Sequence, residues 1–252
     1  MHDINIKTLF DPVKHSLTKV NEHTNQIIQK IDQDIANITK DYFKRGYKIG
    51  GFLATNRTDV TGESERVLPL DNNTKELVIS QISKYVSWEY PALEIGPGDG
   101  EWTKHLVAAE PLYLVDINEE FLESTRNNFN PEYQRRLCCY YLELVEEETS
   151  LSKLPQQQLG FVFSWNLFNY LTLDMIDAYL GEIFKVLRDG GVAMFSYNNA
   201  ERYHCAKHVE EGFMSYVPKA LLLNLVNKYG FELLSAVDAD YFVSWVEIRK
   251  PG

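Results

Sequence analysis

The segment Leu93–Gly100, with the sequence LEIGPGDG, constrains the fold of this 252-residue chain more than any other stretch. An apolar run ends there in glycines at alternate positions, Gly96, Gly98 and Gly100, and we expect a helix to follow over Glu101–Ala109. Glycine lets a backbone turn tightly and approach a ligand closely, because it has no side chain. A strand, a glycine turn and a helix in this order are typical of the first cofactor-binding turn of an α/β domain.

Composition and charge exclude several classes of protein. The net charge of −11 argues against a nucleic-acid partner, because phosphate binding relies on clustered lysine and arginine. The three cysteines are Cys138, Cys139 and Cys205, and the adjacent pair is expected in a buried strand, so a disulfide framework is disfavoured. No stretch approaches the about 20 apolar residues that a membrane span needs. We therefore expect a cytoplasmic protein without a secretory signal or membrane span.

Residues 1–45 are expected to form a helical extension, with one long helix from residue 11. Its apolar positions from Val13 to Ile31 alternate between spacings of four and three residues. This repeat suits a coiled coil that would join copies of the chain, and it suits equally an amphipathic helix packed on the chain's own globular domain. Residues 46–74, which begin rich in glycine and polar residues, are expected to form a connector or a lid.

Residues 75–252 are expected to form an α/β domain in which strands and helices alternate. Asn118 is expected to cap the helix that follows the second strand, and the pair Gly190-Gly191 to end the helix before the fifth. The last two strands lie too close in sequence for a parallel crossover, so they should pair antiparallel. The pattern predicts a doubly wound, mostly parallel, seven-stranded, Rossmann-like sheet with a C-terminal hairpin. Strands are expected at 91–95, 112–116, 137–144, 161–165, 192–197, 231–236 and 241–248, and helices at 72–86, 118–129, 174–187 and 217–229.

Asp116 ends the second strand, 20 residues beyond Gly96, where a carboxylate can accept hydrogen bonds from ribose hydroxyls. The turn reads Gly-x-Gly-x-Gly, unlike the Gly-x-Gly-x-x-Gly of dinucleotide enzymes, and Glu94 precedes its first glycine by two residues. With Tyr113–Ile117 and Leu187–Gly191, these motifs make residues 75–248 resemble a class I S-adenosylmethionine-dependent methyltransferase. The resemblance implies the fold and the cofactor, and it says nothing about the acceptor.

The same resemblance implies roles for individual residues at the cofactor. The glycine turn would pass the amino-acid part and the ribose along bare backbone, Glu94 would hold the turn or the ammonium group, and Ile117 would pack on the adenine. Glu143 would meet the adenine amine, although the sequence around it departs from the family's commoner Gly-Asp pattern. The expected cofactor-binding residues are Glu94, Gly96, Pro97, Gly98, Gly100, Asp116, Ile117, Glu143, Ser164, Trp165 and Asn166, the last three beside the sulfonium and its methyl group.

The acceptor is expected beyond the fifth strand, because ligands in such sheets bind past the carboxyl ends of the strands. His204 is the best candidate for a general base, since imidazole titrates near neutral pH, and Asn198 and Glu201 are the other candidate catalytic residues. An ordinary solvated loop and helix start would explain the same residues. His204 and His208 have the i, i+4 spacing of metal ligands, but no metal is expected, because no HExxH-type acid lies between them.

Three functions remain possible from the sequence. The leading one is methyl transfer from S-adenosylmethionine to oxygen or nitrogen of a small-molecule or glycan acceptor. The second is a dinucleotide-dependent oxidoreductase, which shares the glycine turn and Asp116 but not the glycine spacing, Glu94 or the terminal hairpin. The third is a non-catalytic scaffold that retains the cofactor and works through its N-terminal helix.

Overall fold

The computed structural model describes residues 19, 22–27, 30, 70–142, 150–210, 214–239 and 242–252. The chain divides into two compact units, residues 1–42 and 43–252. Residues 19, 22–27 and 30 of the first unit are helical. The rest of the helix expected from residue 11 lies outside the described residues, as does the expected connector before residue 70, so the coiled coil and the lid stay predictions.

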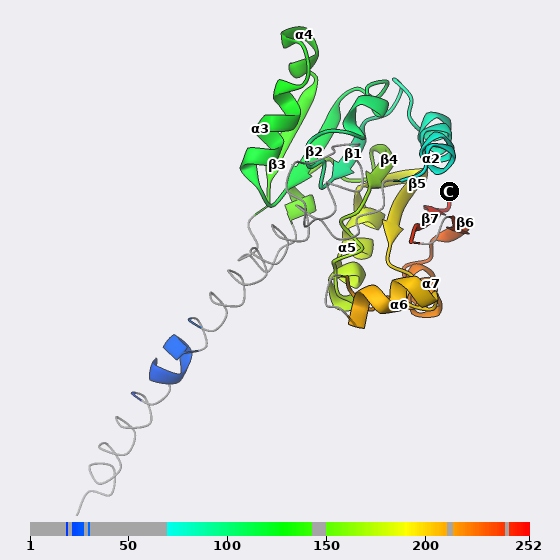
Figure 1. Ribbon diagram of the computed structural model, residues 1–252. Coiled ribbons are helices and arrows are strands. Elements are labelled where there is room, and N and C mark those ends of the chain that lie inside the picture. The colour runs from blue at the N-terminus through cyan, green and yellow to red at the C-terminus, as the bar shows by residue number, and fades with distance from the viewer. Residues whose placement is uncertain are drawn as a thin grey trace, which may run out of the picture. The chain divides into compact units, whose positions relative to one another are not determined.

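The second unit is built on one sheet, which has seven strands among the described residues, in the order β3-β2-β1-β4-β5-β7-β6 (Figure 1). The first five of these strands in the chain pair in parallel, while β7 pairs antiparallel with both β5 and β6. The expected fold class is confirmed. The strands are β1 (Ala92–Ile95), β2 (Leu112–Asp116), β3 (Leu137–Tyr141), β4 (Leu159–Ser164), β5 (Leu187–Tyr197), β6 (Glu232–Asp238) and β7 (Ser244–Arg249).

Helices cover both faces of the sheet, because successive side chains of a strand point to opposite sides. Leu93 and Ile95 join the core that includes α5 and α7, whereas Ala92 joins the core that includes α2 and α3. The helices are α2 (Asn72–Tyr85), α3 (Glu119–Asn127), α4 (Pro131–Gln134), α5 (Leu173–Val186), α6 (Tyr203–Glu210) and α7 (Lys219–Lys228), with 3-10 turns η1 (Thr103–His105) and η2 (Ser150–Lys153).

One edge of the sheet gathers the chain's candidate functional residues. The carboxyl ends of β1, β2, β4 and β5 meet there because these strands are parallel. Ser244, the first residue of β7, pairs with Tyr197, the last residue of β5, so the turn between β6 and β7 lies at the same edge. Asn118 caps α3 as predicted, since its side-chain oxygen accepts the Glu120 N–H at 3.2 Å.

Two expected helix features are wrong. Residues 101–109 do not form an α-helix: the N–H groups of His105, Leu106 and Ala109 each bond three residues back, which gives η1 and irregular turns. The pair Gly190-Gly191 does not end a helix either, since α5 stops at Val186 and the pair lies inside β5. A Cβ on Gly191 would lie 2.8 Å from the Leu159 carbonyl oxygen, so close approach of β4 explains this glycine.

The adjacent cysteines are not buried as expected. Cys139 is exposed and Cys138 half-buried, because β3 is an edge strand with a neighbour on one side only. The strand also ends at Tyr141 rather than at the expected residue 144, and residues 143–149 lie outside the described part. No disulfide joins the three cysteines, all of which lie in the described part of the chain.

Candidate cofactor and acceptor site

The glycine turn has the backbone geometry that its sequence predicts. Gly96, Gly98 and Gly100 have φ angles of +71°, +60° and +81°, which L side chains rarely adopt. The Gly96 N–H donates to the Val115 carbonyl at 2.8 Å and ties the start of the turn to β2. The Gly100 N–H donates to the Pro97 carbonyl at 2.9 Å and closes the turn. This backbone therefore depends on glycine at all three positions.

Glu94 lies in β1, two residues before the first glycine of the turn, and is almost completely buried. The Thr103 hydroxyl donates to its carboxylate at 2.6 Å, and Thr103 is itself fully buried. Burial raises the pKa of Glu94 from 4.5 to about 8, although the Thr103 bond opposes the shift. A buried carboxyl with so little compensation is a candidate ligand for a positively charged group. The sequence analysis did not identify Thr103. The only sign of it in the sequence is that a small polar residue follows the glycine turn closely.

Asp116 lies at the end of β2, beside β1, and is 6% exposed. Its carboxylate accepts the Asn118 N–H at 2.8 Å. Burial raises the pKa of Asp116 to about 6, against the backbone N–H groups of Asn118, Gly98 and Ile117. Ile117 is half-buried against the core on the α5 side. The structure thus brings the predicted carboxylate to the glycine turn, with Ile117 next to it.

The loop after β4 crosses from the glycine turn towards β5. The Ser164 hydroxyl donates to the Ile95 carbonyl at 2.8 Å, and Trp165 is buried with its ring 5.1 Å from that of Trp102. Asn166 has a φ of +60°, and its N–H donates to the Ser196 hydroxyl at 2.7 Å. Trp165 thus packs in the aromatic core, whereas the unusual backbone of Asn166 marks a conformation that its surroundings impose.

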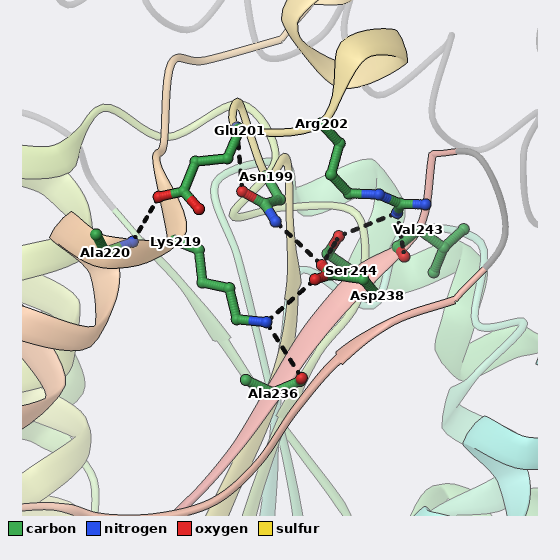
Figure 2. A network of polar contacts seen from close by, with 9 residues as sticks. All are labelled: Asn199, Glu201, Arg202, Lys219, Ala220, Ala236, Asp238, Val243 and Ser244. Atoms are coloured by element: carbon green, nitrogen blue, oxygen red, sulfur yellow. Dashed lines mark hydrogen bonds and ion pairs between the residues drawn. The ribbon is translucent and has the colours of Figure 1, made fainter.

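Hydrogen bonds join the polar loop after β5, residues 198–202, to α7 and to the turn between β6 and β7 (Figure 2). Asp238 accepts from the Asn199 side chain at 3.0 Å, the Ser244 hydroxyl at 2.8 Å and the Lys219 ammonium at 3.1 Å. The Glu201 carboxylate accepts the Ala220 N–H at 2.9 Å and so anchors the start of α7. Arg202 donates to the Val243 carbonyl at 2.9 Å. These residues fasten α6 and α7 to the β6–β7 turn.

Asn198 is fully buried, and its side-chain nitrogen donates to the Cys205 and Ser215 carbonyls at 3.2 and 3.1 Å. Its side-chain oxygen has no hydrogen-bond partner among the described residues. His204 and His208 are half-buried and flank the Phe242 ring, at 5.5 and 4.8 Å between ring centroids. The structure therefore brings the candidate catalytic residues Asn198, Glu201 and His204 together after β5. His204 and His208 each pack against the Phe242 ring.

Glu143 lies outside the described residues, so its expected contact with adenine stays a prediction. Within the described residues, no group of three or more His, Cys, Asp or Glu is arranged to hold a metal ion. The described helices also include none that is long and apolar enough to cross a membrane.

The residues at the turn fit an S-adenosylmethionine molecule. Its ribose offers two hydroxyl donors to the Asp116 carboxylate, and its ammonium offers a positive charge to Glu94. A side chain on Gly96 or Gly100 would come within 3.2 Å of Leu167 or 3.0 Å of Thr125, so the cradle is shaped by bare backbone. When bound, the cofactor supplies a methyl group that its positive sulfur activates, which leaves binding, alignment and the exclusion of water to the protein.

Comparisons with solved structures agree with this fold. The chain is similar to an S-adenosylmethionine-dependent methyltransferase from Mesorhizobium loti, at 14% identity and a TM-score of 0.54, covering 69% of this chain and 96% of that one. A methyltransferase from Methanosarcina mazei gives 14% and 0.54, with 68% and 97% covered. Geranyl diphosphate C-methyltransferase from Streptomyces coelicolor, solved with S-adenosyl-L-homocysteine, gives 8% and 0.58, with 83% and 98% covered. No curated protein sequence matches the chain significantly.

The sheet order, the glycine turn and the adjoining carboxylate have the arrangement expected of a class I S-adenosylmethionine-dependent methyltransferase. Residues 92–191 match the family described as "Methyltransferase domain", and they contain the turn, Asp116 and the loop after β4. Residues 92–191 are therefore a methyltransferase domain, and solved S-adenosylmethionine-dependent methyltransferases share its fold. The dinucleotide oxidoreductase that the sequence left open is disfavoured accordingly.

Proposed function

We propose that this enzyme methylates an oxygen or nitrogen atom of a small-molecule or glycan acceptor. The observation that carries the proposal is the position of the hydrogen-bonded loop of residues 198–202 at the edge of the sheet where β1 and β2 end. Ligands of such sheets bind beyond this edge, and a polar wall suits an acceptor with hydroxyl or amine groups. The net charge of −11 disfavours a nucleic-acid acceptor.

In this proposal Asp116 holds the ribose hydroxyls, Glu94 the ammonium group, and Ile117 the adenine face. Ser164 and Asn166 line the site beside the methyl group. Ser164 is held by its hydrogen bond to β1 and Asn166 by its hydrogen bond to β5. Alignment of the acceptor alone can contribute about 7–11 kcal/mol in well-oriented systems, so methyl transfer needs no fixed catalytic triad. An oxygen acceptor also needs a base, for which His204 is the candidate.

Transfer of a labelled methyl group tests the acceptor class directly. The purified protein is incubated with methyl-labelled S-adenosylmethionine and a cell extract, which is then separated into small-molecule, glycan, protein and nucleic-acid fractions. The proposal predicts label in the first two fractions with the wild-type protein and none with Asp116→Ala. Label that accumulates in protein or nucleic acid would contradict it.

A further inference from the structure

The glycine turn receives side-chain hydrogen bonds from Thr125 of α3 and from Asn128, the residue that follows α3, and not from a helix that continues the turn. Residues 101–109 form only η1 and turns, so no long helix continues the backbone of the turn. Glycine loses more conformational freedom on folding than any other residue, and three glycines within five positions need outside support to hold one shape. A cofactor site that is shaped before binding also loses less entropy when the ligand arrives.

Two side chains of α3 and its C-terminus reach across to that turn. The Thr125 hydroxyl donates to the Gly98 carbonyl at 2.8 Å, and Thr125 is fully buried. The Asn128 side-chain nitrogen donates to the Asp99 carbonyl at 2.7 Å, at an exposed position. Both bonds fix carbonyls of consecutive peptide units in the middle of the turn.

The same contact limits what can stand at Gly100. A Cβ there would lie 3.0 Å from the Thr125 methyl carbon and 3.3 Å from the Asn128 nitrogen, and the φ of Gly100 is +81°. The turn is therefore pressed against α3 as well as hydrogen-bonded to it. Thr125 contributes both the tight contact and the bond.

Asp116 holds the other side of the same glycine. The Gly98 N–H is one of the groups that lower the pKa of Asp116, while the Gly98 carbonyl faces Thr125. Asp116 also accepts the N–H of Asn118, the residue that caps α3. The carboxylate and the helix thus form one β2–α3 unit that fixes both polar groups of Gly98.

We propose that Thr125 is a positioning residue for the cofactor, and that its hydroxyl holds the Gly98 carbonyl so that the glycine turn stays in its binding shape. Asn128 makes the same kind of contribution one residue further along the turn, more weakly because water competes for its bond. Loss of the Thr125 hydroxyl frees the peptide unit between Gly98 and Asp99 to rotate. The inference rests on the proposed site for the cofactor at this turn.

Isosteric variants at position 125 test the inference without any acceptor. Binding of S-adenosylhomocysteine is measured by titration calorimetry at a temperature where each variant is fully folded. Thr125→Val keeps the size but loses the donor, and we expect affinity about tenfold weaker, as for one buried hydrogen bond. Thr125→Ser keeps the donor, and we expect affinity within about twofold of the wild type. A merely structural role would move the melting temperature without this pattern in affinity.

Tyr85→Phe is the control, because it also removes a hydroxyl that donates a hydrogen bond, here from half-buried Tyr85 to Glu247 of β7 at 2.6 Å, away from the turn. It should lower the melting temperature and leave S-adenosylhomocysteine affinity unchanged. Wild-type affinity in Thr125→Val, or equal losses in Thr125→Val and Thr125→Ser, would overturn the inference.

If Thr125→Val does not fold, the exposed Asn128→Ala decides instead. Affinity about threefold weaker supports the inference, and unchanged affinity overturns it. A wild-type protein that does not bind S-adenosylhomocysteine at all would contradict the proposed function itself. Binding by the wild type with no change in the variants would contradict only the role of α3.

Discussion

The pKa values of the carboxyl groups shift in opposite directions in the two parts of the candidate site, at the glycine turn and beside the loop that follows β5. At the glycine turn, burial raises the pKa of Glu94 to about 8 and that of Asp116 to about 6. Beside the loop that follows β5, burial also tends to raise the pKa of Asp238, the last residue of β6, but hydrogen bonds from Ser244, Asn199 and Lys219 outweigh burial and leave this pKa below its usual value. The turn therefore keeps carboxyls that a ligand can complete, whereas the Asp238 carboxylate already has its partners within the protein.

The largest expected effect concerns Glu94. Its carboxyl binds a proton more tightly in the folded state than in the unfolded one, so its stabilising contribution is full below pH 4.5 and is lost as the pH rises towards 8. A neutral Gln avoids the buried charge. We expect Glu94→Gln to match the wild type at pH 4.5 and to exceed it by up to about 4 kcal/mol at pH 8 in urea unfolding. If Glu94→Gln is less stable than the wild type at pH 8, the buried Glu94 carboxyl does not have the raised pKa on which this comparison depends.

Paired substitutions of Asp116 and Asp238 compare the two sides directly. Asp116→Ala should weaken S-adenosylhomocysteine binding by about 1.5–3 kcal/mol, the size of charge-assisted hydrogen bonds, as measured by calorimetry. Asp238→Ala should instead lower the free energy of unfolding by about 1–2 kcal/mol, because it leaves the Asn199 and Ser244 donors without their acceptor. Its affinity for S-adenosylhomocysteine should equal that of the wild type. Equal binding losses in both variants would erase the distinction.

The smallest expected effect separates backbone strain from ligand contact. Gly100 and Gly230 have φ angles of +81° and +77°, but a Cβ on Gly230 would meet nothing within 4 Å. In thermal unfolding, Gly230→Ala should cost about 1–2 kcal/mol of stability, as for any left-handed residue, and Gly100→Ala more than that, because its Cβ would lie 3.0 Å from the Thr125 methyl carbon. Only Gly100→Ala should also weaken S-adenosylhomocysteine binding, by about tenfold or more. Comparable binding in the two variants would show that the turn is not the site.

The sequence predicts the sheet well, because buried strands are continuous apolar runs between turn residues. It fails at 101–109 and at Gly190-Gly191 for physical reasons. Trp102 and Leu106 are both buried four residues apart, a spacing that 3-10 turns can share with an α-helix. Glycine after a helix indicates a cap only when no neighbouring strand approaches, and Leu159 approaches here.

The candidate site is predictable only in part. Gly96, Gly98, Gly100 and Asp116 stand in a spacing that sequence alone shows, whereas the contacts of Thr125 come from α3 and depend on tertiary packing. The prediction of an acceptor site after β5 rested on the position of the loop past the carboxyl ends of the strands and on the number of polar residues there. Their hydrogen bonds are used within the loop, α7 and the β6–β7 turn, which no count of polar side chains can reveal.

A crystal structure of the protein with S-adenosylhomocysteine would show whether the glycine turn and Asp116 bind the cofactor. We expect the ribose hydroxyls to lie within hydrogen-bond distance of the Asp116 carboxylate and the amino-acid end of the ligand to lie along Gly96–Gly100. A ligand bound elsewhere on the sheet, or an Asp116 carboxylate turned away from the ribose, would contradict this expectation.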